Sequence, residues 1–177
     1  IHLRCAVLRG MGRGEEALAA ARAAAERDPL DLWARFELLA LTGEGEEEIR
    51  SIFGQKAENF LDVVCDYLEA GLTQDALRVL DLADPDYPLV SYYRGFCRPL
   101  AGEDPTDAPK KAAALDPGLC FPSRLEDIAV LRFAANANPA DANACYYLGC
   151  LFYDRFRYEE AIGCWEDCIA RDPDHAK

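Results

Sequence analysis

Residues 142–173 carry the clearest structural pattern of the sequence and read ANACYYLGCLFYDRFRYEEAIGCWEDCIARDP, from Ala142 to Pro173. It divides into two segments, about 142–154 and 158–171, in which apolar residues recur every three or four positions, as they do on one face of a helix. Glu159 and Glu160 fall in the first turn of the second segment, where carboxylates favour the positive end of the helix dipole. The stretch therefore predicts two helices joined by a short polar bend.

Proline residues mark the same ending elsewhere in the chain. Pro173 follows Pro139 by 34 residues, and proline can neither continue a helix nor leave the preceding residue free to be helical. Comparable apolar segments end at Pro29, Pro85 and Pro117. The recurrence predicts internal repeats of a helix pair.

With Ala142 counted as position 1, this unit resembles the tetratricopeptide repeat family, whose repeat is a helix pair of 34 residues. The residues that match the family pattern are Leu148, Gly149, Phe152, Ala161, Trp165, Cys168 and Pro173. Cys145 departs from it, because a large aromatic residue is usual at that position. The resemblance implies that small residues let the two helices approach closely, and we expect Gly149 and Ala161 to face each other.

Weaker copies of the unit cover most of the chain. Residues 57–85 match well, the segment that ends at Pro29 enters midway through a first helix, and residues 31–55 are the most degenerate copy. Tyr92 to Gly95 mirrors the Tyr-Tyr-Leu-Gly of the last unit. The resemblance implies an all-α fold, a right-handed α-α superhelix of about five helix pairs, that forms a single domain over residues 1–177.

One helix, near 122–138, has no partner in this scheme. Its sequence is apolar at helical spacing, and Ser123 and Glu126 predict a capping box at its start. No first helix fits between Pro117 and Pro122. We therefore expect eleven helices, of which this one is unpaired.

Composition excludes several classes of function. The chain has 177 residues and a formal net charge of −13, and a surface this acidic repels phosphate backbones, which argues against nucleic acid as a partner. The longest apolar stretch, Cys145 to Tyr153, is far shorter than the roughly 20 residues that cross a bilayer. We expect neither nucleic-acid nor membrane binding.

Cysteine and histidine usage argues against a metal site, a cofactor and an enzyme. The eight cysteines include no CxxC pair, and most lie among apolar residues, which is typical of buried free thiols and of a reducing compartment such as the cytoplasm. Cys164 and Cys168, four residues apart, could join Cys145 or Cys150 in a metal site, but packing explains them better. His2 and His175 stand at opposite ends of the chain. We therefore expect no catalytic residue, and all eight thiols reduced and metal-free.

The remaining candidate site is a groove. In the family that this sequence resembles, the first helix of each pair lines a concave face. The residues at the corresponding positions include Phe36, Leu61, Tyr92, Phe96, Asn143, Tyr146, Tyr153 and Asp154. This face is aromatic and apolar with an acidic rim, as binding surfaces often are, although the same residues could instead pack within the array or under a neighbouring domain. One subclass of the family clamps acidic C-terminal peptides with Lys and Asn at two fixed positions of this face, and neither residue stands at those positions here.

The function implied is a non-catalytic protein–protein interaction or scaffold module. The run from Cys120 to Glu166 also resembles the C-terminal repeat array of large bacterial multidomain proteins, which combine it with a β-rich domain similar to carbohydrate-active folds. The alternative is therefore an array that docks on such a domain of its own parent chain. Because no polar cap closes the array, we also expect weak self-association through its ends, around Ile169 at one end and Leu3 and Val7 at the other.

Overall fold

The computed structural model describes residues 2–54, 56–104 and 107–175, and every regular element in these ranges is an α-helix. The chain divides into two compact units, Ile1–Ala83 and Asp84–Lys177. The eleven helices expected from the sequence are present in the described ranges, and the all-α fold is confirmed. The single domain over residues 1–177 stays a prediction.

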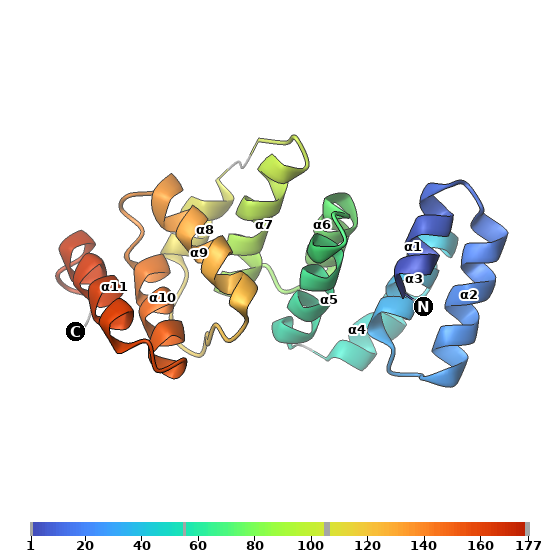
Figure 1. The fold of residues 1–177 in the computed structure, drawn as a ribbon, viewed down its shortest axis with the longest axis horizontal. Coiled ribbons are helices and arrows are strands. Elements are labelled where there is room, and N and C mark those ends of the chain that lie inside the picture. The colour runs from blue at the N-terminus through green and yellow to red at the C-terminus, as the bar shows by residue number, and fades with distance from the viewer. Residues whose placement is uncertain (1, 55, 105–106, 176–177) are drawn as a thin grey trace. The chain divides into compact units, whose positions relative to one another are not determined.

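The first unit contains two helical hairpins and two further helices (Figure 1). Its helices are α1 (His2–Gly10), α2 (Gly14–Arg27), α3 (Leu32–Thr42), α4 (Glu46–Phe53), α5 (Ala57–Glu69) and α6 (Thr73–Leu82). α3 packs against both helices of the α1–α2 hairpin, α4 packs on α3, and α5 pairs with α6. The buried face of α2 consists of Ala17, Ala21 and Ala24, and such small side chains let its neighbours approach closely.

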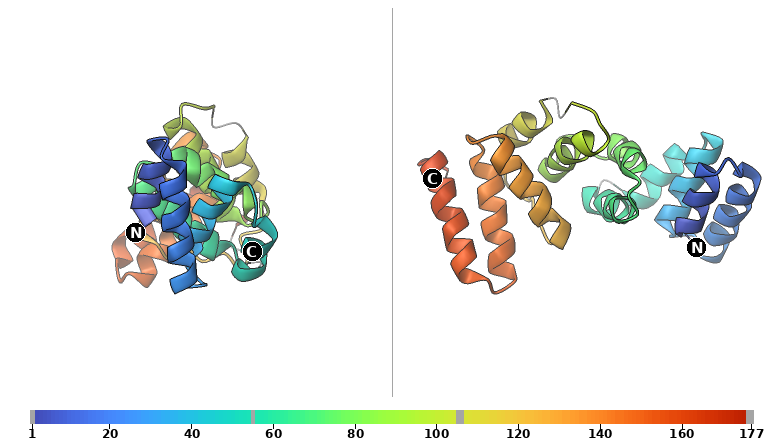
Figure 2. Two further views of the ribbon diagram at one scale, coloured as in Figure 1. Left: turned by 90° about the vertical axis from the view of Figure 1, so that its right-hand side faces the viewer. Right: turned by 45° about the horizontal axis from the view of Figure 1, so that its top comes forward.

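The second unit holds the decisive stretch of sequence. Its helices are α7 (Pro88–Leu100), α8 (Ala108–Ala114), α9 (Leu125–Ala137), α10 (Ala142–Asp154) and α11 (Tyr158–Arg171). The bounds of α10 and α11 confirm the two predicted segments, and these helices form the most extensively packed hairpin of the unit. α9 packs against both α7 and α10, and Figure 2 shows α9, α10 and α11 side by side.

The prolines end helices as predicted. Asp28, Asn138 and Asp172 each precede a proline, and each takes an extended conformation as the C-cap residue directly after its helix, with φ of −135°, −129° and −140°. Extended backbone is what a following proline requires. After two of these prolines, Asp31 and Asp141 begin the next helix by accepting a hydrogen bond from a backbone N–H three residues on, the usual device of an N-cap.

The start of the helix near 122–138 differs from the prediction. α9 begins at Leu125, and its capping carboxylate is Asp127, whose Oδ2 accepts hydrogen bonds from the backbone N–H groups of Ser123 and Arg124, each at 2.9 Å. The predicted capping box of Ser123 and Glu126 is therefore wrong. Asp127 caps the helix because its other oxygen, Oδ1, also accepts a hydrogen bond of 2.7 Å from the hydroxyl of buried Tyr93. Its carboxylate is therefore fixed from two sides.

Candidate partner-binding surfaces

The structure places the predicted groove residues in two different settings. Leu61, Tyr92, Phe36 and Asn143 are buried, with exposed fractions of 0%, 1%, 5% and 7%. Phe96 is half-buried and its ring packs edge-on against Phe133 at 5.7 Å between centroids. The exposed members of the set are Tyr146, Tyr153 and Asp154, all on α10.

Tyr92 joins α7 to the start of α10. Its hydroxyl donates a hydrogen bond of 2.9 Å to Oδ1 of Asp141, the residue that caps α10. Burial, and then the neighbouring carboxylate, raises the pKa of Tyr92, so the phenol stays protonated and keeps donating. Tyr92 therefore positions a helix and offers no surface to a partner.

Asn143 has a comparable structural role. Its Nδ2 donates to the carbonyl oxygens of Ala113 and Leu115 at 3.0 and 3.1 Å, which lie at the C-terminal end of α8. Its Oδ1 lies 2.6 Å from Nε2 of His175, at hydrogen-bonding distance. Asn143 thus satisfies carbonyl groups that the short helix α8 leaves unpaired.

The two exposed tyrosines belong to a ring cluster that spans α10 and α11. The Tyr153 ring lies 5.3 Å from that of Tyr158 and 5.7 Å from that of Trp165, between centroids. Tyr146 lies 5.2 Å from the ring of His175. These separations are typical of favourable aromatic pairs, so the rings are held in place while their outer faces remain in solvent.

A hollow of about 660 Å³ opens beside this cluster. Its walls are formed by Asp116, Pro117, Gly118, Tyr146, Trp165, Cys168, Ile169 and His175. We name this hollow, together with the adjoining rings of Tyr153 and Tyr158, the α10–α11 groove. Most of its lining is apolar, as in sites that take up side chains of a partner.

Gly149 explains why α10 and α11 can lie so close together. A Cβ atom at this position would lie 2.2 Å from Nε1 and 2.4 Å from Cδ1 of Trp165, far inside van der Waals contact. The expected partner of Gly149, Ala161, is buried, but the group that occupies the space left by the glycine is the Trp165 ring. That ring then forms a wall of the α10–α11 groove.

The exposed side of α11 was not predicted from the sequence, apart from Ile169 at its end. Tyr158, Ile162 and Ile169 are 48%, 53% and 52% exposed, although only Ile169 was expected to be exposed. The signal was present, since α11 carries more apolar residues than its contact with α10 requires. Those that are fully buried are small, namely Ala161 and Cys168.

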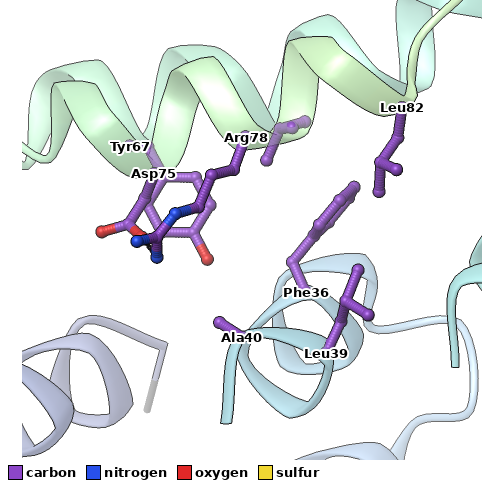
Figure 3. Close-up of a pocket in the computed structure, with 8 residues that line it drawn as sticks. Phe36, Leu39, Ala40, Tyr67, Asp75, Arg78 and Leu82 are labelled. Atoms are coloured by element: carbon purple, nitrogen blue, oxygen red, sulfur yellow. Dashed lines mark hydrogen bonds and ion pairs between the residues drawn. The ribbon is translucent and has the colours of Figure 1, made fainter. Parts of the chain in front are cut away.

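The first unit has a smaller pocket between α3 and the α5–α6 hairpin, of about 330 Å³ (Figure 3). Its lining residues are Phe36, Leu39, Ala40, Tyr67, Asp75, Arg78, Val79 and Leu82. Figure 3 shows Phe36 and Leu39 on the side of Leu82, with Asp75 and Arg78 together near Tyr67. Arg78 Nη1 is 3.2 Å from Asp75 Oδ1, so this pocket has an apolar part and a charge-paired part.

A buried carboxylate fixes one wall of this pocket. Glu37 is fully buried and accepts hydrogen bonds from Nε and Nη2 of Arg9, at 3.0 and 3.1 Å, and from the hydroxyl of Tyr67 at 2.8 Å. Hydrogen bonding to Glu37 is the main cause that raises the pKa of Arg9, and burial raises that of Tyr67. Both donors therefore stay protonated, and a fully partnered buried charge holds α1, α3 and α5 in one arrangement.

The cysteine side chains are free thiols with suppressed acidity. Burial raises the pKa of Cys145 to about 11 and also raises the pKa of Cys150, Cys164 and Cys168. Thiolates are the nucleophilic and metal-binding form, so protonated thiols suit packing better than chemistry. Within the described ranges, no three His, Cys, Asp or Glu residues are grouped so that they could hold a metal ion.

The family model of the tetratricopeptide repeat matches residues 142–175, which are α10, α11 and the turn after them. Residues 142–175 form a tetratricopeptide repeat. The α10–α11 groove is thus formed mainly by this repeat, with one wall from Asp116 to Gly118, and Gly149 and Trp165 are the small and large residues that shape it.

Other comparisons give more distant similarities. No curated protein matches the chain. Among solved structures, a crystal structure of MamA shares 19% identity, with 94% of this chain and 72% of that chain covered and a TM-score of 0.30. A crystal structure of YrrB, described as a TPR protein with an unusual peptide-binding site, shares 17% identity, with 97% and 84% covered and a TM-score of 0.33.

A search of the described residues for a helix both long enough and apolar enough to cross a membrane found none.

Proposed function

We propose that the chain is a non-catalytic protein-interaction scaffold whose tetratricopeptide repeat binds a partner protein or peptide in the α10–α11 groove. One observation carries the proposal: the repeat exposes Ile169 in the lining of an apolar hollow, and Tyr153 and Tyr158 in the ring cluster that adjoins its Trp165 wall, while its own core is filled by other residues. Aromatic side chains placed in this way are favoured at interfaces, because they bury a large area with few rotatable bonds.

The eight predicted groove residues contribute to this function in different ways. Tyr146, Tyr153 and Asp154 offer surface to the partner. Phe36 lines the pocket of the first unit, and half-buried Phe96 packs on Phe133. The other buried members act through the helices that they hold in place; they are Leu61, Tyr92 and Asn143. Binding energy should concentrate in the exposed aromatic residues.

The composition supports the remaining parts of the proposal. A net charge of −13 favours protein partners over nucleic acid, and eight free thiols, six of them buried, favour a reducing compartment, which we take to be the cytoplasm. The raised thiol pKa values speak for a role without metal or cofactor.

Two other occupants of the surface remain as alternatives. In the first alternative, the array docks on a carbohydrate-active-type domain of its own parent chain. In the second, it associates weakly with itself through Leu3 and Val7 on α1 and Ile169 on α11, which are 52%, 49% and 52% exposed. Either would cover apolar side chains that the described residues leave in solvent.

Site-directed photocrosslinking tests the proposal. A photoreactive phenylalanine derivative at position 153 should crosslink to a protein partner, whereas the same group at position 170, which is exposed on α11 but outside the hollow, should not. A crosslink within the full parent chain would favour the docking alternative, and a crosslink to a second copy would favour self-association. Equal labelling from both positions would contradict a specific binding face.

A further inference from the structure

α11 presents an apolar stripe along its length. Its members are Tyr158, Ile162, Trp165 and Ile169, which follow one another at intervals of four, three and four residues. This is the spacing of one face of a helix, and it is the pattern of ridges that a second helix packs against. Trp165 packs on Gly149 of α10, whereas Tyr158, Ile162 and Ile169 are each about half exposed, at 48%, 53% and 52%, so the described residues cover the α11 stripe only in part.

The tyrosines of α10 form a second wall beside the α11 stripe. The Tyr153 ring lies within 5.7 Å of the Trp165 ring, and Tyr146 lines the same hollow as Trp165 and Ile169. From Tyr158 to Ile169 the stripe extends about 16 Å along the helix axis. This length corresponds to about three helical turns of an occupant, which is the length over which an amphipathic helix usually engages a groove.

The charges at the C-terminal half of the groove are negative and largely uncompensated. Asp116, Glu166 and Asp172 are exposed, and none of the three forms an ion pair with a described residue. Arg171 is the one arginine among residues 161–175, and this segment contains no lysine. Its guanidinium is turned away from the groove, because Nη1 donates to the carbonyl oxygens that end α9 and begin α10.

We propose that the α10–α11 groove binds an amphipathic helix of a partner protein, with apolar side chains against the α11 stripe and lysine or arginine side chains toward Asp116, Glu166 and Asp172. The helical spacing of the stripe specifies a helix, and the unpaired carboxylates specify its basic flank. This inference rests on the proposed function and adds the shape and charge of the partner.

A designed peptide tests this chemistry directly. The probe is a fluorescent helical peptide of about 18 residues with leucines at intervals of four, three and four and lysines beside them, titrated at about 0.15 M salt. One control peptide has the same composition in scrambled order, and a second replaces lysine with glutamate. The native chain should bind the probe at least about tenfold more tightly than either control peptide, a difference of about 1.4 kcal/mol.

Protein variants locate the binding. Ile162→Ser with Ile169→Ser should weaken binding of the probe at least about tenfold, and Glu166→Lys should weaken it without touching the apolar stripe. The matched control is Leu100→Ser with Leu125→Ser, which removes two side chains of similar exposure, 58% and 66%, that do not line the hollow. Its affinity for the probe should stay unchanged, and circular dichroism should show native helicity in all variants.

Two results would overturn the inference. Equal binding of the scrambled peptide would show attraction by charge alone, and full binding by the isoleucine variant would place the probe elsewhere. A protein partner that is released by Tyr146→Ala with Tyr153→Ala but retained by the isoleucine variant would leave the proposed function intact and refute the helix. A partner retained by both variants would refute both.

Discussion

Gly149 is the residue on which the packing of the last hairpin depends most. Any Cβ there meets the Trp165 ring at 2.2 Å, and the ring also lies 5.7 Å from that of Tyr153, between centroids. We predict that Gly149→Leu lowers the free energy of unfolding by about 1–3 kcal/mol through overpacking. Urea denaturation measures the loss.

A second glycine provides the matched control. Gly163 lies inside α11, and a Cβ atom there would have nothing within 4 Å. Gly163→Ala should therefore stabilise the protein by up to about 1 kcal/mol, the difference in helix propensity. If both glycine substitutions changed stability by the same amount, the Trp165 contact would not be the cause.

Asp141 gives the second prediction, a dependence on pH. Burial raises its pKa although Ala144 N–H and the Tyr92 hydroxyl both favour the ionised form, and its Oδ2 is buried without a hydrogen-bond partner among the described residues. A raised pKa in the folded state contributes stability that is fully present below the unfolded value and is lost as the pH rises through the folded value. Acidification toward pH 4 should therefore favour the native state at this site.

The measurement compares Asp141→Asn with the native chain. Asparagine keeps the N-cap acceptor and cannot ionise, so the variant should gain stability relative to the native chain as the pH rises from about 4 to 7. Denaturation at several pH values would reveal this trend. Parallel pH profiles for the two proteins would contradict the assignment to Asp141.

Among the helices, α8 depends most on a side chain from elsewhere. It has seven residues, too few for stability on their own, and Asn143 bonds two carbonyl groups at its end. We predict that Asn143→Ala leaves these carbonyls without their donor and speeds hydrogen exchange of the amides in α8. Exchange in α11 should not change.

Tyr146→Ala is the control for this third prediction. Tyr146 lies on the same helix as Asn143, and its ring contacts are with Tyr147 and His175. Its removal should leave exchange in α8 at the native rate. Equally fast exchange in both variants would show that α8 responds to any change in α10 and not to the loss of the Asn143 hydrogen bonds.

Helices were easier to predict from the sequence than the surfaces they expose. The bounds of α10 and α11 follow from apolar spacing and from Pro173, because both act within a few residues. The start of α9 was misplaced because Asp127 is fixed by Tyr93, a residue 34 positions away. The same limit applies to the groove: Tyr92 and Asn143 occupy groove positions in the repeat, yet distant partners, Asp141 and the end of α8, turn them inward.

The molecule as a whole consists of two units that each contain a core. Tyr67, Leu61 and Leu80 are fully or almost fully buried in the first unit, and Tyr93 and Leu151 in the second. Helical repeats draw stability from their nearest neighbours, so we predict that residues 84–177 fold on their own. The excised segment should show helical circular dichroism and one cooperative melting transition, and an unfolded segment would contradict the prediction.

Affinity and melting temperature, measured together on Tyr146→Ala with Tyr153→Ala, test most directly whether the α10–α11 groove is a binding face. These rings are 36% and 57% exposed, so their removal should shift the melting temperature by less than about 3 °C. Affinity for the partner crosslinked from position 153 should fall at least about tenfold. A variant that melts as early as Gly149→Leu would show that the two tyrosines belong to the core, and one that keeps native affinity would show that they do not form the binding surface.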